Sequence, residues 1–263
     1  MGLIDQVRDS VRLKYYRMLG YYPTRLDDTN FRCHPDDWRF WRKIKRGRWE
    51  PFTFRILSRF LNSDCVYFDL GAWIGPTVLY ASQICKEVYC FEPDPYAYER
   101  LLTNLRLNEI KNVKTFHSAV LNKDGFIRIG HPDGLGTSES SIFKAEEESA
   151  IEVRCTTIER IVELLDIEKI DMVKIDIEGA EFDLLPSAGK FIMNYRPTIY
   201  LSTHAPLLPQ NNRIQKMNDI IRVLSCYSYI YDCGLKRIEL ELITTPEFTN
   251  HFSGFIVSEE KLS

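Results

Sequence analysis

Residues 66–75 have the sequence Val-Tyr-Phe-Asp-Leu-Gly-Ala-Trp-Ile-Gly, and this stretch decides the fold of the chain. Its apolar first half predicts a buried strand that carries Asp69 near its end. The two glycines predict a tight turn, and the apolar pattern over 76–85 predicts a helix. A strand, a glycine-containing turn and a helix are the unit with which open α/β sheets approach a nucleotide. Gly71 and Gly75 let the backbone come close to a ligand where a Cβ atom would collide.

A second predicted strand, over 87–92, ends at a carboxylate. Glu92 stands about 20 residues after Gly71, where an acidic side chain accepts hydrogen bonds from ribose hydroxyls. Asp94 and Pro95 follow, which are favourable residues at the N-cap and at the first position of a helix. The sequence therefore predicts a cofactor that contains adenosine.

Predicted strands and helices alternate along most of the chain. We expect strands at 65–70, 87–92, 113–120, 125–129, 151–155, 171–176, 198–203, 227–232 and 253–258, and helices at 3–20, 51–61, 76–85, 95–108, 157–166 and 211–225. This alternation predicts an α/β fold with a doubly wound, mostly parallel sheet. Residues 21–37 are expected to be an irregular connector, and residues 131–149 a long polar loop, either a lid or a plain excursion. We predict a helical, basic and aromatic extension over 1–50 and a cofactor-binding domain over 51–263.

The composition predicts a soluble intracellular protein. No apolar run reaches the roughly 18 residues that a membrane-spanning helix needs, and charges interrupt the N-terminus where a signal peptide would be apolar. The seven cysteines include no Cys-x-x-Cys pair, which favours reduced, buried thiols over disulfides or a zinc site. The predicted location is the cytoplasm, with peripheral binding at the inner membrane face as a further option.

Charge is unevenly distributed along the chain. Residues 1–60 carry 14 lysines and arginines against 7 acids, whereas the remainder carries 20 against 30. The basic residues between Arg39 and Arg48 alternate with aromatic ones, a pattern that would suit an anionic substrate, a phosphorylated lipid carrier or a membrane surface. The favoured interpretation is a solvated helix face that packs its aromatic rings on the acidic body. That acidic body argues against nucleic acid as a partner. The amphipathic helix 3–20 could pack on the body, on a second subunit of a homodimer or on a membrane.

The glycine turn distinguishes between two adenosine cofactors. A nicotinamide dinucleotide needs Gly-x-Gly-x-x-Gly, so that free N–H groups at the helix N-terminus hold its pyrophosphate. Here Trp73 replaces the middle glycine, and Pro76 removes a backbone donor. S-adenosylmethionine has no phosphate, so Asp69 could hold its amino acid end and Glu92 its ribose. The turn favours the methyl donor over an NAD(P)-dependent oxidoreductase.

Three motifs resemble the signatures of the FkbM family, which consists of class I S-adenosylmethionine-dependent O-methyltransferases. They are Asp-Leu-Gly-Ala-Trp-Ile-Gly at 69–75, Phe-Glu-Pro-Asp at 91–94 and Val-Lys-Ile-Asp-Ile-Glu-Gly-Ala-Glu at 173–181. The third motif is the most specific, and the resemblance covers residues 48–205, including an aromatic–Glu element at 48–51. The family usually has Asn where Trp73 stands. The resemblance implies a Rossmann-like, seven-stranded sheet and methyl transfer to a hydroxyl of a sugar, a glycan or a glycosylated natural product.

The motifs and their neighbours define the predicted cofactor site. Its residues are Glu50, Asp69, Gly71, Ala72, Trp73, Gly75, Glu92, Pro93, Ser118, Ala119 and Asp176. The acceptor is expected to be a sugar, glycan or other small molecule with a hydroxyl group, and the basic N-terminal segment would suit an anionic one. Intact acids at the strand ends argue against a decayed, non-catalytic protein that only docks on glycans or membranes.

The predicted catalytic residues are His204, Asp176 and Glu178. Ligands bind beyond the carboxyl ends of parallel strands, and His204 follows the predicted strand 198–203 there. A neutral imidazole can accept a hydroxyl proton at cellular pH, so His204 is the expected base, oriented by Asp176. The same three residues could hold Mg²⁺, but the absence of an adjacent acid pair after strand 198–203 favours a metal-free reaction.

Overall fold

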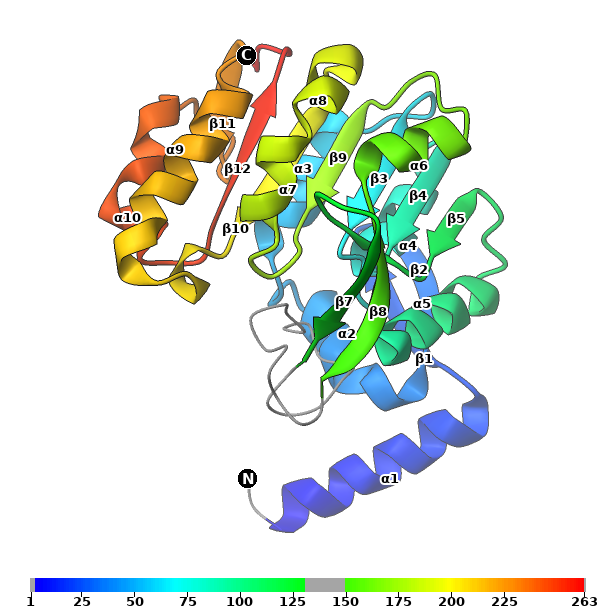
Figure 1. The fold of residues 1–263 in the computed structure, drawn as a ribbon. Helices are drawn as coiled ribbons and strands as arrows, with labels where there is room; N and C mark the ends of the chain where they lie inside the picture. Colours follow the sequence, from blue (N-terminus) through cyan, green and yellow to red (C-terminus); the bar gives the residue numbers. More distant parts are fainter. Residues whose placement is uncertain (1–2, 131–149, 263) are drawn as a thin grey trace.

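The central element of the structure is a sheet of seven strands, seen in a computed structural model that describes residues 3–130 and 150–262 (Figure 1). Its order is β11-β12-β10-β9-β3-β4-β5, and β12 alone among these strands runs antiparallel to its neighbours. The strands are β3 Val66–Leu70, β4 Glu87–Phe91, β5 Val113–Phe116, β9 Met172–Ile175, β10 Thr198–Thr203, β11 Tyr229–Asp232 and β12 Ser253–Ser258. The predicted doubly wound, mostly parallel sheet is confirmed.

The strand order reverses direction at β3, which lies between β4 and β9. The register aligns Leu70 of β3 with Phe91 of β4 and with Ile175 of β9, and Ile175 with Leu201 of β10. The turns that follow these four strands therefore leave the sheet at the same edge. A crevice at such a switch point is where open α/β sheets bind ligands.

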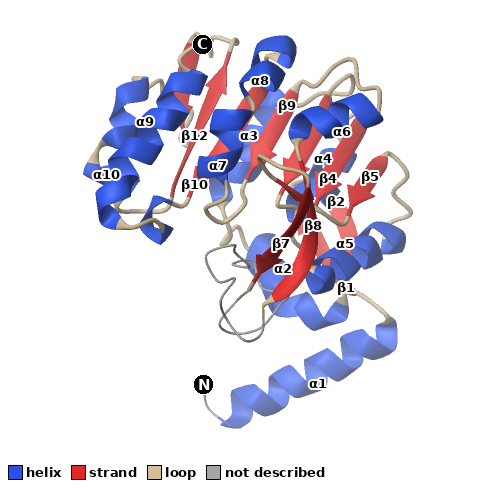
Figure 2. Ribbon diagram, viewed as in Figure 1, coloured by secondary structure: helices blue, strands red, loops and turns tan. Residues whose placement is uncertain are grey.

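Helices cover both faces of the sheet, as Figure 2 shows. One face is covered by α3 Pro51–Phe60, α4 Pro76–Ser82 and α5 Pro95–Leu107, and the other by α6 Ile158–Leu164, α7 Glu181–Ser187, α8 Gly189–Tyr195 and α9 Arg213–Leu224. Successive strand side chains point to opposite faces. Thus Tyr67 packs on the face covered by α3, α4 and α5, while Phe68 and Leu70 pack on the face covered by α6, α7, α8 and α9. Burial on both faces explains why these strands are almost continuously apolar.

The N-terminal region contains a hairpin where the sequence predicted an irregular connector. Strands β1 Tyr22–Leu26 and β2 Thr29–Cys33 pair antiparallel, and β1 alternates strictly between buried and exposed residues. That period of two was visible in the sequence, but Pro23 and the aspartates of the turn obscured it. In helix α2, Trp38–Lys45, the side chains of Trp38 and Trp41 are buried with those of the hairpin. Helix α1, Leu3–Leu19, projects from this region (Figure 1).

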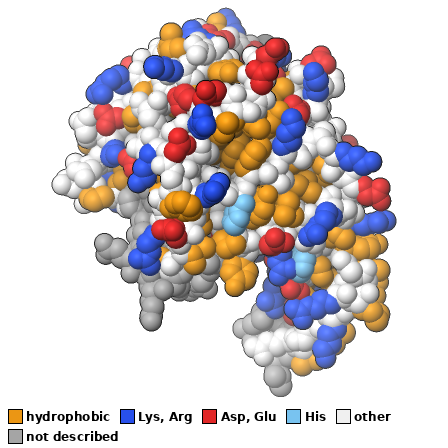
Figure 3. All heavy atoms as spheres, turned by 45° about the vertical axis from the view of Figure 1, so that its right-hand side comes forward, with side chains coloured by type: hydrophobic (Ala, Val, Ile, Leu, Met, Phe, Trp, Pro, Cys, Tyr) orange, Lys and Arg blue, Asp and Glu red, His pale blue; other side chains and the backbone are white. Residues whose placement is uncertain are grey.

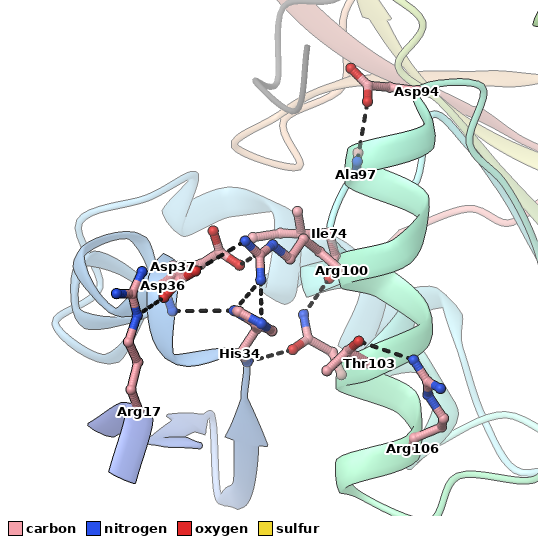
Figure 4. A network of polar contacts seen from close by, with 11 residues as sticks. Arg17, His34, Asp36, Asp37, Ile74, Asp94, Ala97, Arg100, Thr103 and Arg106 are labelled. Carbon is pink, nitrogen blue, oxygen red and sulfur yellow. Dashed lines mark hydrogen bonds and ion pairs between the residues drawn. The ribbon is translucent and has the colours of Figure 1, made fainter. Parts of the chain in front are cut away.

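A polar network joins the N-terminal region to α5 (Figure 4). Arg100 forms an ion pair with Asp36 at 3.2 Å, and Arg17 of α1 contacts the same carboxylate at 2.7 Å. The fully buried Asn104 accepts a hydrogen bond from the His34 backbone at 2.7 Å and donates one to the Ile74 carbonyl at 2.8 Å. One α5 side chain thereby connects the N-terminal region with the glycine turn.

The remaining elements lie outside the seven-stranded sheet. The predicted strand 113–120 is split, because β5 ends at Phe116 and a short strand β6, Ala119–Val120, joins a second small sheet. That small sheet also contains β7 Gly125–Ile129 and β8 Ile151–Thr156. Helix α10, Pro246–Thr249, lies near the C-terminus. Short 3₁₀ turns cover Pro35–Asp37, Ala205–Leu207, Gln210–Asn212 and Leu240–Thr244. The predicted loop 131–149 falls outside the described residues. Across 3–130 and 150–262, no helix is both long and apolar enough to cross a bilayer. All seven cysteines are free thiols.

Candidate active site at the carboxyl edge of the sheet

The glycine turn after β3 is shaped by close contact with the protein itself. Gly71 has φ +84°, and a Cβ atom there would lie 1.9 Å from the Asp176 carbonyl oxygen. Gly75 has φ +90°, and its Cβ would lie 2.5 Å from Leu101 Cδ1 of α5. Positive φ and missing space both demand glycine. The first glycine lets the turn pass the end of β9, and the second lets helix α4 begin against α5.

Glu92 lies directly beyond β4 and is buried, with 6% of its surface exposed. One carboxylate oxygen accepts the Trp73 N–H at 2.7 Å, and the other accepts the Asp94 N–H at 2.8 Å. Burial raises the pKa of Glu92 to about 8, although these two N–H groups oppose the shift. Each oxygen still has a lone pair for a ligand. Glu92 thus fixes the glycine turn and presents an acceptor to the cavity beside it.

A first cavity opens between this carboxylate and the small sheet. Its walls are Gly71, Trp73, Phe91, Glu92, Pro93, Ser118, Ala119, Val120, Leu121, Ile127, Ile129, Asp176, Ile177, Glu178 and Ala180. Most of these side chains are apolar, and the polar ones are those of Glu92, Ser118, Asp176 and Glu178. Such a lining suits a flat base and a ribose. Seven of the predicted cofactor residues lie in it: Gly71, Trp73, Glu92, Pro93, Ser118, Ala119 and Asp176.

A second cavity adjoins the first and is more polar. It is lined by Trp49, Glu50, Phe52, Thr53, Gly71, Ala72, Trp73, Pro76, Thr77, Lys174, Asp176, Glu178, Tyr200, Ser202, Thr203, His204, Leu207, Cys233, Phe252, Ser253 and Gly254. The two cavities share Gly71, Trp73, Asp176 and Glu178. The wall of the second cavity contains all three predicted catalytic residues, His204, Asp176 and Glu178, together with the predicted cofactor residues Glu50 and Ala72.

Two predicted cofactor residues, Asp69 and Gly75, line neither cavity. Asp69 is fully buried beneath the turn, where the hydroxyls of Tyr67 and Thr77 donate to its Oδ2. Burial is the main cause that raises its pKa, against the opposing effect of Lys174, whose Nζ lies 3.9 Å from Oδ1. In this structure Asp69 supports Thr77 and Lys174 from beneath the turn, and its contact with a cofactor stays a prediction. The period of two placed this side chain on an interior face of the sheet.

Lys174 and Asp176 form a buried ion pair at the floor of the second cavity. Their Nζ and Oδ2 atoms are 2.9 Å apart, and the Lys174 side chain is only 4% exposed. Burial works to lower the pKa of Lys174, but Asp176, Asp69 and Glu50 outweigh it and raise the pKa. Conversely, burial works to raise the pKa of Asp176, and Lys174 and His204 outweigh it and lower the pKa. Both groups are therefore charged at neutral pH.

His204 lies among three carboxylates. Its Nε2 is 3.4 Å from Glu178 Oε1 and 3.6 Å from Asp176 Oδ1, and its Nδ1 is 3.2 Å from Oε1 of the fully buried Glu181. Burial works to lower the pKa of His204, but Glu178, Glu181 and Asp176 raise it to about 10. These carboxylates therefore favour the protonated imidazole, whereas the predicted role of His204 as the base needs the neutral form.

The same cluster offers ligands for a cation. One atom each from Asp176, Glu178 and His204 lies within 4.8 Å of the others. Carboxylate oxygens and an imidazole nitrogen suit a divalent ion such as Mn²⁺, and Glu181 on Nδ1 would orient the histidine toward it. The donor set therefore fits a metal, in competition with the proton that His204 holds here.

Several residues of the site were not found from the sequence. One of them is Phe40 of α2, which packs edge-on against the predicted residue Trp73 (φ +48°) at a centroid distance of 4.4 Å, so α2 supports the turn. Thr53 contacts Glu50 at 2.9 Å and the Tyr200 hydroxyl at 3.0 Å. The spacing of Glu50 and Thr53, three residues apart at a helix start, was a signal that could have revealed their pairing. Phe252 reaches the cavity from the turn before β12, and no local motif marks it.

The fold and the site define a Rossmann-like methyltransferase of class I. The Methyltransferase FkbM domain model matches residues 69–232. The chain belongs to the FkbM methyltransferase family.

Three proteins illustrate what the chain is similar to. The chain is 26% identical to the hexuronic acid methyltransferase AglP of Haloferax volcanii over 171 residues, which are 65% of this chain and 69% of that protein. Among solved structures, it is similar to an FkbM methyltransferase from Methylobacillus flagellatus, with TM-score 0.48 and 18% identity, covering 74% of this chain but 43% of that one. It is also similar to a Streptococcus mutans putative methyltransferase in complex with SAH, with TM-score 0.44 and 12% identity over 79% of this chain and 96% of that one.

Proposed function

We propose that this methyltransferase uses S-adenosylmethionine to methylate a hydroxyl group of a sugar. The observation that supports this most is the wall that the two cavities share at Gly71, Trp73, Asp176 and Glu178. A cofactor whose nucleoside occupies the first cavity would place its methionine end at that wall. Its methyl group would then face an acceptor bound in the second cavity.

The charge of the site favours this cofactor over a nicotinamide dinucleotide. S-adenosylmethionine carries a sulfonium and an ammonium group, and the shared wall presents the carboxylates of Asp176 and Glu178. Glu50 adds a third in the second cavity. The pyrophosphate of NAD would meet these acids, and Pro76 offers it no N–H at the start of α4.

The reaction is a displacement at carbon. A lone pair of the acceptor oxygen forms the new O–C bond, the C–S bond breaks, and its electron pair remains on sulfur to give S-adenosylhomocysteine. The hydroxyl proton must go to a base, and a positioned base contributes about 10²–10⁴-fold. Because the three neighbouring carboxylates favour a protonated His204 and Lys174 holds Asp176, we assign the proton to Glu178, with His204 as its cationic partner.

A sugar acceptor has two sources of support. The Haloferax relative is named for a hexuronic acid, which is a sugar. The second cavity combines the aromatic rings of Trp49, Trp73 and Phe252 with hydroxyl and carboxylate groups. Apolar rings and a few placed polar groups are what a sugar, with one apolar face and many hydroxyls, requires.

The test is methyl transfer from S-adenosylmethionine to a panel of methyl glycosides, followed by mass spectrometry of the products and of S-adenosylhomocysteine. We expect a methyl ether and an equal amount of S-adenosylhomocysteine. Products methylated on nitrogen or carbon would contradict the proposal. A parallel reaction with EDTA separates the two states of the cluster, because a protonated His204 predicts unchanged turnover and a bound metal predicts its loss.

A further inference from the structure

The second cavity is rich in acids, and its cations are already paired. Glu50, Asp176 and Glu178 line it, and the only lysine or histidine groups in the described part of its lining are Lys174 and His204. Lys174 contacts Asp176 at 2.9 Å, and His204 lies between Glu178 and Glu181 at 3.4 and 3.2 Å.

Two buried acids behind the wall of the second cavity add to the acidic character of the site. Asp69 and Glu181 are both fully buried next to Lys174 and His204. No arginine belongs to the cavity lining among the described residues. Arg55 lies outside this lining; its guanidinium is 5.2 Å from the centroid of the Phe52 ring and donates to the Cys233 carbonyl at 3.4 Å.

We propose that the acceptor is an uncharged sugar and that a sugar with its own carboxylate is rejected. This inference rests on the proposed function and adds the substrate class. A uronic acid would place its carboxylate among Glu50, Asp176 and Glu178, and in the described part of the lining both cations, Lys174 and His204, are already paired with acids. Like charges in such a partly buried site are strongly unfavourable. An uncharged pyranoside offers the same hydroxyls and ring, and the exposed Phe252 can cover its apolar face. This proposal differs from the expectation that the basic N-terminal segment would suit an anionic acceptor.

The experiment compares pairs of methyl glycosides that differ only at C6, such as methyl glucoside and methyl glucuronide, with galacto and manno pairs alongside. Binding to the protein saturated with S-adenosylhomocysteine is measured by saturation-transfer NMR and competition. We expect each neutral sugar that binds to bind at least about tenfold more tightly than its uronide. In Glu50→Gln the preference should shrink, whereas Asp183→Asn, on the exposed surface of α7, should retain it.

Each other outcome has a definite meaning. A uronide that binds as tightly as its partner overturns the inference while leaving sugar methylation in place. Binding of no sugar of either kind overturns the inference as well. Failure to bind S-adenosylhomocysteine in the first step would instead contradict the proposed function itself.

A second feature, helix α1, supports an independent inference. Its contacts with the body include those of Asp9, which pairs with Arg39 at 2.9 Å, of Tyr16, whose ring lies 4.8 Å from that of Tyr22, and of Arg17, which pairs with Asp36 at 2.7 Å. The opposite side exposes an apolar stripe of Val7, Val11, Tyr15 and Met18, with 62% of Val11 and 83% of Met18 accessible. Figure 3 shows hydrophobic side chains on the outer edge of this projecting part of the molecule.

Basic side chains border this stripe. At 100° per residue, Lys14 falls on one side of it and Arg8 and Arg12 on the other, and all three are exposed. An exposed apolar stripe between basic borders is the pattern of helices that lie in the interface of an anionic membrane. We infer that α1 binds an anionic lipid surface and thereby holds the body of the protein, with its two cavities, at that surface.

The test is sedimentation of the full chain with vesicles of phosphatidylcholine alone or with 30% phosphatidylglycerol, a composition chosen as about one third anionic. We expect binding only to the anionic vesicles. The double change Val11→Ser and Met18→Ser should reduce it at least about tenfold, as should Lys14→Glu. Leu164→Ser and Met193→Ser, which alter exposed apolar residues elsewhere, should not. No binding to anionic vesicles, or a dimer in light scattering that the double change dissociates, would overturn the inference.

Discussion

The two adjoining cavities are built in different ways, although they share a wall. The first is shaped by backbone: Gly71 passes the Asp176 carbonyl, and Glu92 holds the N–H groups of Trp73 and Asp94. The second is shaped by charge: His204, Glu178 and the pair Lys174–Asp176 come from β9, β10 and their turns. Changes in the first should therefore affect cofactor affinity, and changes in the second should affect turnover.

The largest expected effect comes from Gly71→Ala. Its Cβ would collide with a backbone oxygen at 1.9 Å, and φ +84° is itself strained for alanine. We expect calorimetric affinity for S-adenosylhomocysteine to fall by more than about 100-fold and stability to fall by at least about 1–2 kcal/mol. Gly189→Ala is the matched control, because a Cβ there meets nothing within 4 Å. Similar behaviour of the two variants would contradict a turn shaped by backbone contact.

Glu178→Gln should separate turnover from binding. The amide cannot accept the hydroxyl proton as a carboxylate does, so turnover should fall by about 10²–10⁴-fold. Affinity for S-adenosylhomocysteine should change by less than about tenfold, since the glycine turn and Glu92 remain. Asp183→Asn, which alters an exposed acid paired with Lys216, serves as control. Full turnover in Glu178→Gln would remove this residue as the base.

Glu92→Gln tests the first cavity with a smaller change. Both carboxylate oxygens accept backbone N–H groups, and an amide NH₂ would face one of those donors. Hydrogen bonds to charged groups are worth about 1.5–3 kcal/mol, so above the pKa of Glu92, about 8, we expect affinity for S-adenosylhomocysteine to fall by about 10–100-fold. Glu87→Gln, at the other end of β4, should bind normally. Equal affinities would show that Glu92 does not contact the ligand.

The smallest expected effect is a pH dependence that belongs to Glu92. Its pKa of about 8 exceeds the ordinary 4.5, so the folded protein retains a proton that the unfolded chain loses. The associated stability is fully present below about pH 4.5 and is lost as the pH rises through about 8. The unfolding temperature should therefore fall more steeply with rising pH in wild type than in Glu92→Gln. Because ribose hydroxyls donate to the ionised form, ligand affinity should rise over the same range; parallel profiles for the two proteins would contradict this assignment.

The difference between the two cavities also explains which features could be predicted from the sequence. The strand–turn–helix unit at 66–82 and Glu92 are set by neighbouring residues, so the fold was predicted correctly, and seven of the predicted cofactor residues line the first cavity. The charge of His204 depends on Glu178 and Glu181, whose approach follows from β9 and β10 pairing. Phe252, Tyr200 and Phe40 join the site only through tertiary packing. A residue's type and spacing therefore located the site, while its protonation and its acceptor side required the structure.

The central claim is that the first cavity binds the methyl donor, and calorimetric titration with S-adenosylhomocysteine, with NAD as the comparison ligand, tests it most directly. We predict micromolar binding of S-adenosylhomocysteine in wild type, its loss in Gly71→Ala, and no heat with NAD. Binding of NAD, or equal binding of S-adenosylhomocysteine by wild type and Gly71→Ala, would contradict the account.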